Sequence, residues 1–306
     1  MINILYIAGA GRSGSTLLER ILGQLEGVIN VGELRHAWHR SPSTQRCGCG
    51  EMLSECLYCK EVMARADFPL DSEGFASLYK IQRKVDRIRF IPGMLNKSLA
   101  GGEFTRNHAI YVATLRKIYA AIHDITDSHT IVDASKDMST LYLLREMEDV
   151  KLRVLHLVRD SRAVAYSWTR DKVRENVVGE VAYMDQYSPQ RSAFDWIYRN
   201  RMTEMVRGRT DGYTRLHYEA LIAEPTEVIG RIARFIELPE PNLDFIEGGE
   251  IEFSKESHAL AGNPMRFQKG TIKLRMDSAW QNEFKKADKA IVTMLTWPML
   301  RRYEYL

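Results

Sequence analysis

Residues 9–16, Gly-Ala-Gly-Arg-Ser-Gly-Ser-Thr, connect a short apolar run to an amphipathic helix pattern. The preceding residues 4–8, Ile-Leu-Tyr-Ile-Ala, predict a buried strand. Apolar side chains then recur with helical spacing, at Leu17, Leu18, Ile21, Leu22 and Leu25. A strand, a glycine-rich turn and a helix N-terminus direct backbone N–H groups and the positive end of the helix dipole into one small volume. The stretch therefore predicts a phosphate-binding loop.

This loop lacks the lysine that nucleoside triphosphatases use. In the register G-x-x-x-x-G-K-[ST], Gly9 and Gly14 take the glycine positions, and Ser15 stands in place of the lysine. That lysine binds the β- and γ-phosphates of a nucleoside triphosphate. The only cation within the loop is Arg12, three places earlier. We therefore expect an anionic nucleotide without a γ-phosphate, although a glycine-rich loop taken alone fits any nucleotide site.

Residues 10–18 resemble the 5′-phosphosulfate loop of sulfotransferases that use 3′-phosphoadenosine-5′-phosphosulfate (PAPS). Arginine replaces lysine in the carbohydrate, tyrosylprotein and bacterial branches of that superfamily, as Arg12 does here. The resemblance extends from residue 4 to about residue 280, with a gap over 37–128. It implies that the 5′-phosphosulfate is held by Gly11, Arg12, Ser13, Gly14, Ser15 and Thr16.

Composition and charge limit the class of protein. Hydrophobic residues make up 45% and charged residues 27% of the 306 residues, as is ordinary for a soluble globular protein. A net charge of +3 gives no strong field that would favour nucleic acid or membranes as partners. Neither a signal peptide nor an apolar stretch long enough to span a bilayer is visible. We expect one cytoplasmic sulfotransferase domain over residues 1–306, acting on a small-molecule, carbohydrate or peptide acceptor.

Strand-like runs recur along the chain, at 28–31, 130–133, 152–158 and 213–218. Helical patterns follow the last three of these runs. This alternation predicts an α/β fold, a doubly wound parallel sheet of the P-loop type flanked by helices. Ligands in such sheets bind beyond the carboxyl ends of the strands, where all the motifs below fall.

Residues 37–128 interrupt the alternation and are mainly helical over 72–126, with breaks near Pro92-Gly93 and Gly101-Gly102. We expect a helical, cysteine-bearing insertion that covers the acceptor side of the active site. Four basic residues in it either bind an acidic substrate or form a solvated helix face: Arg83, Lys84, Arg87 and Arg89.

Arg159 follows the strand-like run 152–158, and Ser167 lies two helical turns further on. The planar fork of arginine binds phosphate in a bidentate manner, and a hydroxyl on the same side adds a neutral donor. In sulfotransferases an arginine and a serine at this separation hold the 3′-phosphate of PAPS, and the resemblance implies that role here. The alternative is an arginine that caps a strand end and a serine on a polar helix face.

Lys136 and Glu33 are the predicted reacting side chains. Lys136, just beyond 130–133, resembles the family lysine that contacts the transferring sulfuryl group and the bridging oxygen; the alternative is a solvated turn lysine.

Glu33 lies 21 positions after Arg12 and two before Arg35, as the catalytic glutamate of tyrosylprotein sulfotransferases does. A carboxylate at a strand end beside cations can accept the proton of the acceptor. Lys136 and Arg12 are then expected to stabilise the developing charge.

His36 is the second candidate for the base, because it follows Glu33 closely. Cytosolic sulfotransferases use a histidine two residues after their lysine, and Met138 occupies that position here. This difference excludes their variant of the site and favours Glu33, for which a plain surface glutamate remains the alternative. No catalytic metal is expected, since PAPS has no β,γ-diphosphate to bridge.

Two further stretches match the family less tightly. Tyr218, in Tyr-Glu-Ala-Leu-Ile, resembles the tyrosine near the adenine, although a tyrosine in such a stretch taken alone is more often a core residue. Lys269 and Gly270 lie in a stretch that resembles the C-terminal loop over the 3′-phosphate, without its R-K-G-x-x-G-D-W-K form. The tryptophan that follows the first loop in cytosolic members is also missing, and Leu17 and Leu18 occupy that region.

All four cysteines lie in one short stretch, as C-x-C followed by C-x-x-C: Cys47, Cys49, Cys56 and Cys59. The pattern resembles a zinc knuckle, in which four thiolates complete a tetrahedron. The two pairs are closer together than in zinc ribbons, so a disulfide pair and free thiols remain alternatives. A related segment with three cysteines occurs in bacterial sulfotransferase-like sequences, which leaves room for an incidental fourth. A bound zinc would be structural rather than catalytic.

The combined motifs predict a PAPS-dependent sulfotransferase of the EC 2.8.2 type. A P-loop kinase-like phosphotransferase is one rival, against which the missing lysine argues. A non-catalytic nucleotide-binding module is the other. The joint presence of Arg12, Lys136, Arg159 and Ser167 argues against it.

Overall fold

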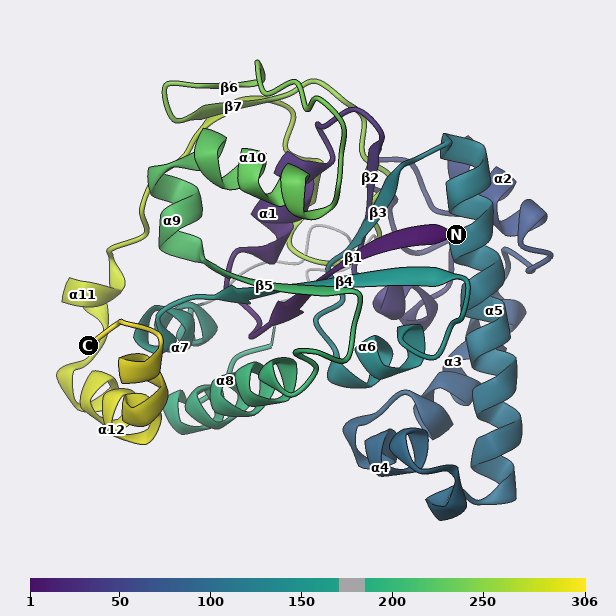
Figure 1. Ribbon diagram of the computed structural model, residues 1–306, viewed down its shortest axis with the longest axis horizontal. Helices are drawn as coiled ribbons and strands as arrows, with labels where there is room; N and C mark the ends of the chain where they lie inside the picture. The colour runs from purple at the N-terminus through teal and green to yellow at the C-terminus, as the bar shows by residue number, and fades with distance from the viewer. Residues whose placement is uncertain (171–184) are drawn as a thin grey trace.

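The computed structural model describes residues 1–170 and 185–306. Its centre is a parallel sheet of five strands in the order β2-β3-β1-β4-β5 (Figure 1). The strands are β1 (Ile2–Gly9), β2 (Val28–Gly32), β3 (Thr130–Asp133), β4 (Val150–Val158) and β5 (Gly212–His217). The predicted parallel α/β sheet is thereby confirmed. β5 ends one residue earlier than expected, because Tyr218 already begins the following helix.

Helices cover both faces of this sheet (Figure 1). One face carries α1 (Ser15–Leu22), α9 (Tyr218–Ala223) and α10 (Pro225–Phe235). The other face carries α6 (Met138–Leu144), α7 (Ser161–Thr169), α8 (Pro189–Glu204) and α12 (Lys286–Arg302). Because successive strand side chains alternate between faces, β1 supplies both layers. Leu5 and Ile7 pack with α1 and α10, whereas Ile4 and Tyr6 join the core on the other side.

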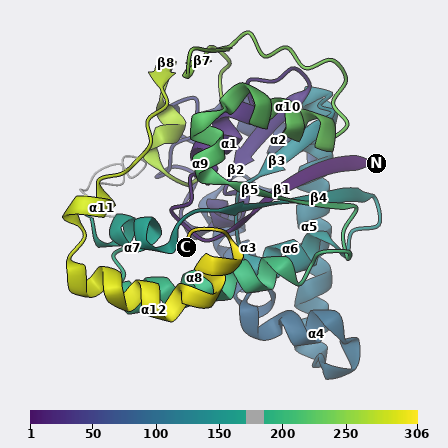
Figure 2. The ribbon, with the colours of Figure 1, turned by 60° about the vertical axis from the view of Figure 1, so that its left-hand side comes forward.

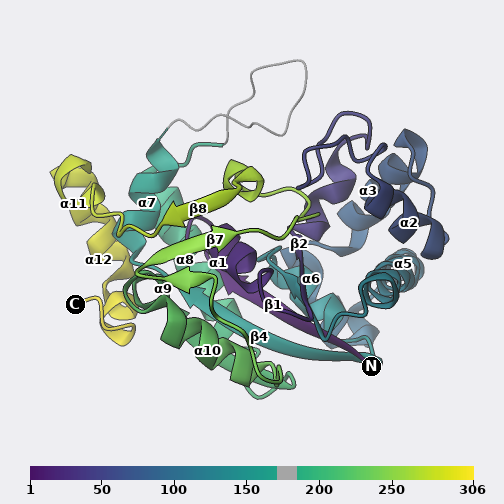
Figure 3. The same ribbon diagram turned by 90° about the horizontal axis from the view of Figure 1, so that it is seen from above.

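Residues 34–126 form a helical group beside the β2 and β3 edge, and most of it falls within the segment 37–128 that was predicted as an insertion (Figure 1). It contains the 3₁₀ helix Leu34–His39, α2 (Leu57–Arg65), α3 (Ser72–Val85), short turns at Ile88–Phe90 and Lys97–Leu99, α4 (Ile91–Leu95) and α5 (Gly102–Thr126). α5 packs against α2 and α3. In the view from above, this group lies at the opposite end of the molecule from α7, α11 (Trp280–Glu283) and α12 (Figure 3).

The basic residues at the end of α3 and just after it mostly face solvent. Arg83, Lys84 and Arg89 are exposed and Arg87 is half-buried, and the ammonium of Lys84 pairs with the carboxylate of Glu103 at 2.7 Å. These contacts favour the solvated helix face over a substrate-binding role.

A second, antiparallel sheet was not anticipated from the sequence. It consists of β6 (Ile246–Glu247), β7 (Glu250–Phe253) and β8 (Gly270–Lys273) and lies on the α1 side of the molecule (Figure 2). Between β7 and β8 the chain forms the 3₁₀ helix Pro264–Phe267, and α11 (Trp280–Glu283) precedes α12. Within the described ranges, every helix is too short or too polar to cross a lipid bilayer.

Candidate active site

Each strand of the parallel sheet places one predicted site residue just beyond its carboxyl end. Arg12 follows β1, Glu33 follows β2, Lys136 follows β3, Arg159 follows β4 and Tyr218 follows β5. All five line one cavity of about 730 Å³, together with Gly11, Gly14, Ser15, Thr16 and Ser167. The topology of a parallel sheet accounts for this convergence, since all the carboxyl ends lie at one edge.

The glycine-rich loop ends at the N-terminus of α1, where backbone donors are available. Gly14 is the N-cap residue and has a φ of 90°, in the left-handed region. The first intrahelical bond joins the N–H of Leu18 to the carbonyl of Gly14 at 3.1 Å, so the N–H groups of Ser15, Thr16 and Leu17 have no partner within the helix. These donors and the helix dipole favour an anion at this position.

Two details of the loop indicate that it is shaped around a ligand. Ser13 is buried, and its Oγ makes no hydrogen bond within the described part of the chain. A Cβ on Gly14 would lie 2.4 Å from Cδ2 of Tyr218, so the tyrosine ring closes one side of the loop. A phosphate group would offer the missing acceptor to Ser13.

Trp168 forms the wall on the other side of the loop. The guanidinium of Arg12 lies 4.5 Å from the centroid of its ring, and the ring of Tyr187 stacks on it at 4.2 Å. A Cβ on Gly11 would come within 2.9 Å of Cζ2 of Trp168. This tryptophan was not predicted from the sequence, although it directly follows Ser167.

Arg159 is a buried guanidinium in direct contact with the loop. Its Nη1 donates to the carbonyl of Arg12 at 3.0 Å, and its Nη2 lies 2.9 Å from Oδ2 of Asp277. The guanidinium also stacks over Tyr218, 4.6 Å from the ring centroid. Arg159 and the loop therefore face the same cavity, as a ligand with two anionic groups requires.

Lys136 and Glu33 form an ion pair at the opposite side of the cavity from Arg159. The Nζ of Lys136 lies 2.5 Å from Oε1 of Glu33 and donates to the carbonyl of Ala134 at 2.8 Å. Burial raises the pKa of Glu33, but the charge and hydrogen bond of Lys136, together with His36 in its protonated form, lower it further than burial raises it. Glu33 is thus ionised at neutral pH and already bound to a cation.

Charged neighbours hold this pair in place. Nε of Arg35 lies 2.9 Å from the buried carboxylate of Asp86, and its Nη1 lies 3.5 Å from Asp137. Nη1 of Arg199 donates to the carbonyl of Lys136 at 3.1 Å. Burial raises the pKa of Asp137, and Arg35 and Arg199 lower it further than burial raises it. Arg199 and Asp137 line the cavity and were not predicted, since both are ordinary charged residues of a turn or helix in the sequence.

His36 lies within reach of Glu33. Its Nε2 is 3.7 Å from Oε2 of Glu33 and 3.7 Å from Oδ2 of Asp137. Burial lowers the pKa of His36 more than these two carboxylates raise it, and burial, with His36 as neighbour, lowers the pKa of His39 to about 4. Both imidazoles are therefore neutral at pH 7.

The C-terminal loop reaches the cavity at other residues than those predicted. Lys269 and Gly270 are exposed, and neither belongs to the cavity lining among the described residues. The lining comes instead from Ala261–Met265 and from Ile272–Arg275, which include Asn263, Lys273 and Arg275. Because the chain between β7 and β8 is irregular, no periodic pattern in the sequence indicates which of its residues face the cavity.

Glu19 is a buried carboxyl group on α1 that makes no hydrogen bond within the described residues. Burial raises its pKa to about 8 from an ordinary value of 4.5. Between these pH values the folded protein holds a proton that the unfolded chain releases, so this group makes the protein less stable as the pH rises through the window.

Glu19→Gln replaces the buried carboxyl group by an amide of nearly the same size, which cannot ionise and so does not lose stability as the pH rises. We expect the variant to gain stability over the wild type by several kcal/mol at pH 8.5 and by much less at pH 5. Urea unfolding of both proteins at the two pH values measures the difference. Equal stability differences at pH 5 and pH 8.5 would contradict the raised pKa.

The structure thus combines a parallel α/β sheet with a glycine-rich loop at a helix N-terminus and a cavity lined by several cations at the strand ends. Residues 4–295 match the family described as "Sulfotransferase domain", and the chain belongs to this family. The predicted membership is thereby confirmed. No curated protein sequence matches the chain significantly.

Several solved structures are similar to this chain. The sulfotransferase domain of the Synechococcus PCC 7002 olefin synthase is 19% identical, over 95% of this chain and 93% of that one, with a TM-score of 0.48. The sulfotransferase domain of the curacin biosynthetic pathway is 13% identical, over 96% and 97%, with a TM-score of 0.46. Sulfotransferase STF1 of Mycobacterium tuberculosis H37Rv is 12% identical, over 78% and 68%, with a TM-score of 0.42.

Proposed function

We propose that this sulfotransferase takes the sulfuryl group from PAPS and transfers it to a hydroxyl or amine, with Glu33 as the general base. One observation supports this most: the loop, Arg159 and the Lys136–Glu33 pair all line one cavity. The donor would thus meet an anion site at each end and a cation–carboxylate pair at the reacting group. A nucleoside triphosphate would meet Ser15 where a kinase of the P-loop type has its lysine.

In this proposal the loop residues from Gly11 to Thr16 hold the 5′-phosphosulfate. Their contribution is the N–H groups at the start of α1, the hydroxyl of Ser13 and the guanidinium of Arg12. Arg159 and Ser167 hold the 3′-phosphate, and Tyr218 lies beside the adenosine. The 3′-phosphate competes with Asp277 for Arg159, because both are anions and Asp277 lies 2.9 Å from that guanidinium. Lys269 and Gly270 stay proposed contacts, with Lys273 and Arg275 as better placed cations.

Lys136 has two successive partners in the proposed reaction. In the absence of PAPS, the ammonium of Lys136 pairs with the carboxylate of Glu33, and Nζ lies 2.5 Å from Oε1. When the sulfuryl oxygens enter the cavity, its ammonium turns toward them and toward the bridging oxygen. Glu33 loses a cation, and because burial then dominates, its pKa rises and it becomes a stronger base.

The transfer itself conserves atoms and charge. The acceptor oxygen or nitrogen forms a bond to sulfur as the bond from sulfur to the 5′-phosphate oxygen breaks. The proton of the acceptor passes to Glu33, and adenosine 3′,5′-bisphosphate leaves. Arg12 and Lys136 stabilise the negative charge that develops on the sulfuryl and leaving oxygens.

The remaining wall of the cavity indicates where the acceptor enters. His39, Arg40 and Gln45, at the start of the 37–128 segment, line it beside Glu33. Gln45 Nε2 donates to the carbonyls of Ala37 and Arg40, which fixes this wall. We propose that an acceptor, whether small molecule, carbohydrate or peptide, approaches along these residues. That the helices of the 37–128 segment cover the acceptor side of the active site stays a prediction.

Incubation with ³⁵S-labelled PAPS and a panel of hydroxyl and amine acceptors tests the reaction. We expect label in an acceptor and an equal amount of adenosine 3′,5′-bisphosphate. A parallel incubation with γ-labelled ATP and Mg²⁺ distinguishes a kinase. Transfer from ATP and none from PAPS would overturn the proposal.

Gly14→Ala is expected to lower the affinity for adenosine 3′,5′-bisphosphate at least about tenfold. The added Cβ forces the Tyr218 ring out of its position, 2.4 Å away, beside the anion site. Gly208→Ala is the matched control, because Gly208 also has a positive φ, of 74°, and nothing within 4 Å of an added Cβ. Calorimetric titration measures both variants. Equal losses would show that backbone strain alone, and not the loop, determines the effect.

A further inference from the structure

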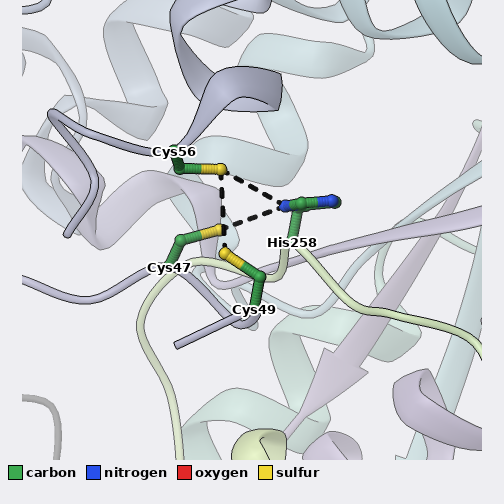
Figure 4. A group of neighbouring side chains, drawn as sticks. All are labelled: Cys47, Cys49, Cys56 and His258. Atoms are coloured by element: carbon green, nitrogen blue, oxygen red, sulfur yellow. Dashed lines mark hydrogen bonds between the residues drawn. The ribbon is translucent and has the colours of Figure 1, made fainter. Parts of the chain in front are cut away.

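Three cysteines and a histidine from distant parts of the chain converge beside the insertion (Figure 4). Cys47 and Cys49 lie in the loop before α2, Cys56 is the N-cap of α2, and His258 follows β7. Their four ligand atoms all lie within 4.8 Å of one another. The sulfur atoms and the histidine nitrogen point toward a common centre (Figure 4).

Three of the separations between these ligand atoms match those around a tetrahedral zinc ion. Sγ of Cys47 and Sγ of Cys56 each lie 3.4 Å from Nδ1 of His258, and Sγ of Cys49 lies 3.8 Å from Sγ of Cys56. Zinc–sulfur bonds of about 2.3 Å and zinc–nitrogen bonds of about 2.0 Å give tetrahedral edges of about 3.8 Å between sulfurs and about 3.5 Å between sulfur and nitrogen.

We propose that Cys47, Cys49, Cys56 and His258 bind one structural zinc ion. The sequence pattern pointed to Cys59 as the fourth ligand, and the structure offers His258 in its place. Cys59 lies on α2 and is buried, with its Sγ 3.7 Å from that of Cys47, but it does not belong to the group whose ligand atoms all lie within 4.8 Å of one another.

Two side chains lie beside the imidazole of His258. The ring of Tyr58 stacks on it at 4.4 Å, and a carboxylate oxygen of Glu256 lies 3.7 Å from Nε2, the ring nitrogen that faces away from the cysteines. The stacked tyrosine holds the ring so that Nδ1 faces Cys47 and Cys56.

The cysteine loop around Gly48 and the chain around His258 approach each other closely. A Cβ on Gly48 would lie 2.5 Å from the carbonyl of Ser257 and 2.9 Å from the nitrogen of Ala259, so only glycine allows this approach. The buried guanidinium of Arg266 donates to the carbonyls of Arg46 and Ala259, next to Cys47 and His258. Three thiolates and Zn²⁺ leave one net negative charge, and this cation compensates it.

The proposed zinc lies on the segment that positions Glu33. Beyond His258, the N–H of Leu260 donates to the carbonyl of Val31 at 2.9 Å, and the N–H of Glu33 donates to the carbonyl of Leu260 at 2.7 Å. A Cβ on Gly262 would lie 3.5 Å from Oε1 of Glu33. The zinc therefore connects the cysteine loop to the end of β2, and its role is structural.

The test is metal analysis of the purified full chain by mass spectrometry, after expression with zinc and under reducing conditions. We expect about one zinc per chain in the wild type and in Cys59→Ser, and loss of zinc in His258→Ala and Cys49→Ser. Removal of zinc by a chelator is expected to lower the melting temperature, and zinc to restore it. Cys59→Ser is the matched control, because it removes a buried thiol of the same cluster.

X-ray absorption at the zinc edge of the wild type gives the ligand set even where a variant fails to fold. Three sulfurs and one nitrogen support the proposal. Four sulfurs, or zinc lost from Cys59→Ser and kept in His258→Ala, would overturn the assignment of His258. A wild-type chain without zinc, or two hydrogens lighter through a disulfide, would overturn the site itself.

Discussion

Glu33→Gln is expected to lower the turnover of sulfuryl transfer by about a hundredfold or more while leaving nucleotide affinity nearly unchanged. Glutamine keeps the size of the side chain but cannot accept the proton of the acceptor. It can still accept a hydrogen bond from Lys136, which lies 2.5 Å from Oε1, so the lysine stays in the cavity. Steady-state rates with PAPS, together with calorimetry of adenosine 3′,5′-bisphosphate, separate the two effects.

His36→Asn is the matched comparison for the base. His36 is neutral at pH 7 because burial lowers its pKa, so it is chemically able to take the proton that we assign to Glu33. We expect His36→Asn to lose far less turnover than Glu33→Gln. The opposite order would transfer the role of base to His36, and unchanged turnover in Glu33→Gln would remove Glu33 from the mechanism.

Arg159→Ala is expected to weaken binding of adenosine 3′,5′-bisphosphate by about ten- to hundredfold, as the loss of a charge-assisted hydrogen bond predicts. Binding of adenosine 5′-phosphate is expected to change little, since it lacks the 3′-phosphate. Calorimetric titration of the two nucleotides gives both affinities. Equal losses for the two would contradict a 3′-phosphate site at Arg159.

Asp277→Asn is the control for this variant. Asp277 lies 2.9 Å from Arg159 and competes with the 3′-phosphate for its guanidinium. Removing that negative charge is expected to raise the affinity for adenosine 3′,5′-bisphosphate. A lower affinity in Asp277→Asn would show that the carboxylate supports the nucleotide site instead of competing with it.

The sheet and the place of the site were predictable because local patterns determine them. Each strand followed by a helix requires a crossover, and crossovers produce a parallel sheet with all carboxyl ends at one edge. Glu33 and Lys136 follow β2 and β3, which are neighbours in the sheet, so their meeting follows from the topology. The roles assigned to them rest on the family resemblance and stay proposals.

Features that depend on contacts between distant segments were not predictable. His258 lies 202 residues from Cys56, and no local pattern connects them. The strands β6 and β8 are short, and their partner β7 alternates buried and exposed residues over only four positions. The position of the C-terminal loop in the cavity depends on this small sheet, so Lys273 and Arg275 could not be distinguished from Lys269 in the sequence.

The proposed function requires one cavity with two anion sites, one at the glycine-rich loop and one at Arg159. Calorimetric titration of the wild type with adenosine 3′,5′-bisphosphate, adenosine 3′-phosphate, adenosine 5′-phosphate and Mg²⁺–ATP tests this directly. We predict that the bisphosphate binds more tightly than the other three, at least about tenfold, because it alone fills both sites. A monophosphate that binds as tightly as the bisphosphate, or Mg²⁺–ATP that binds more tightly, would contradict it.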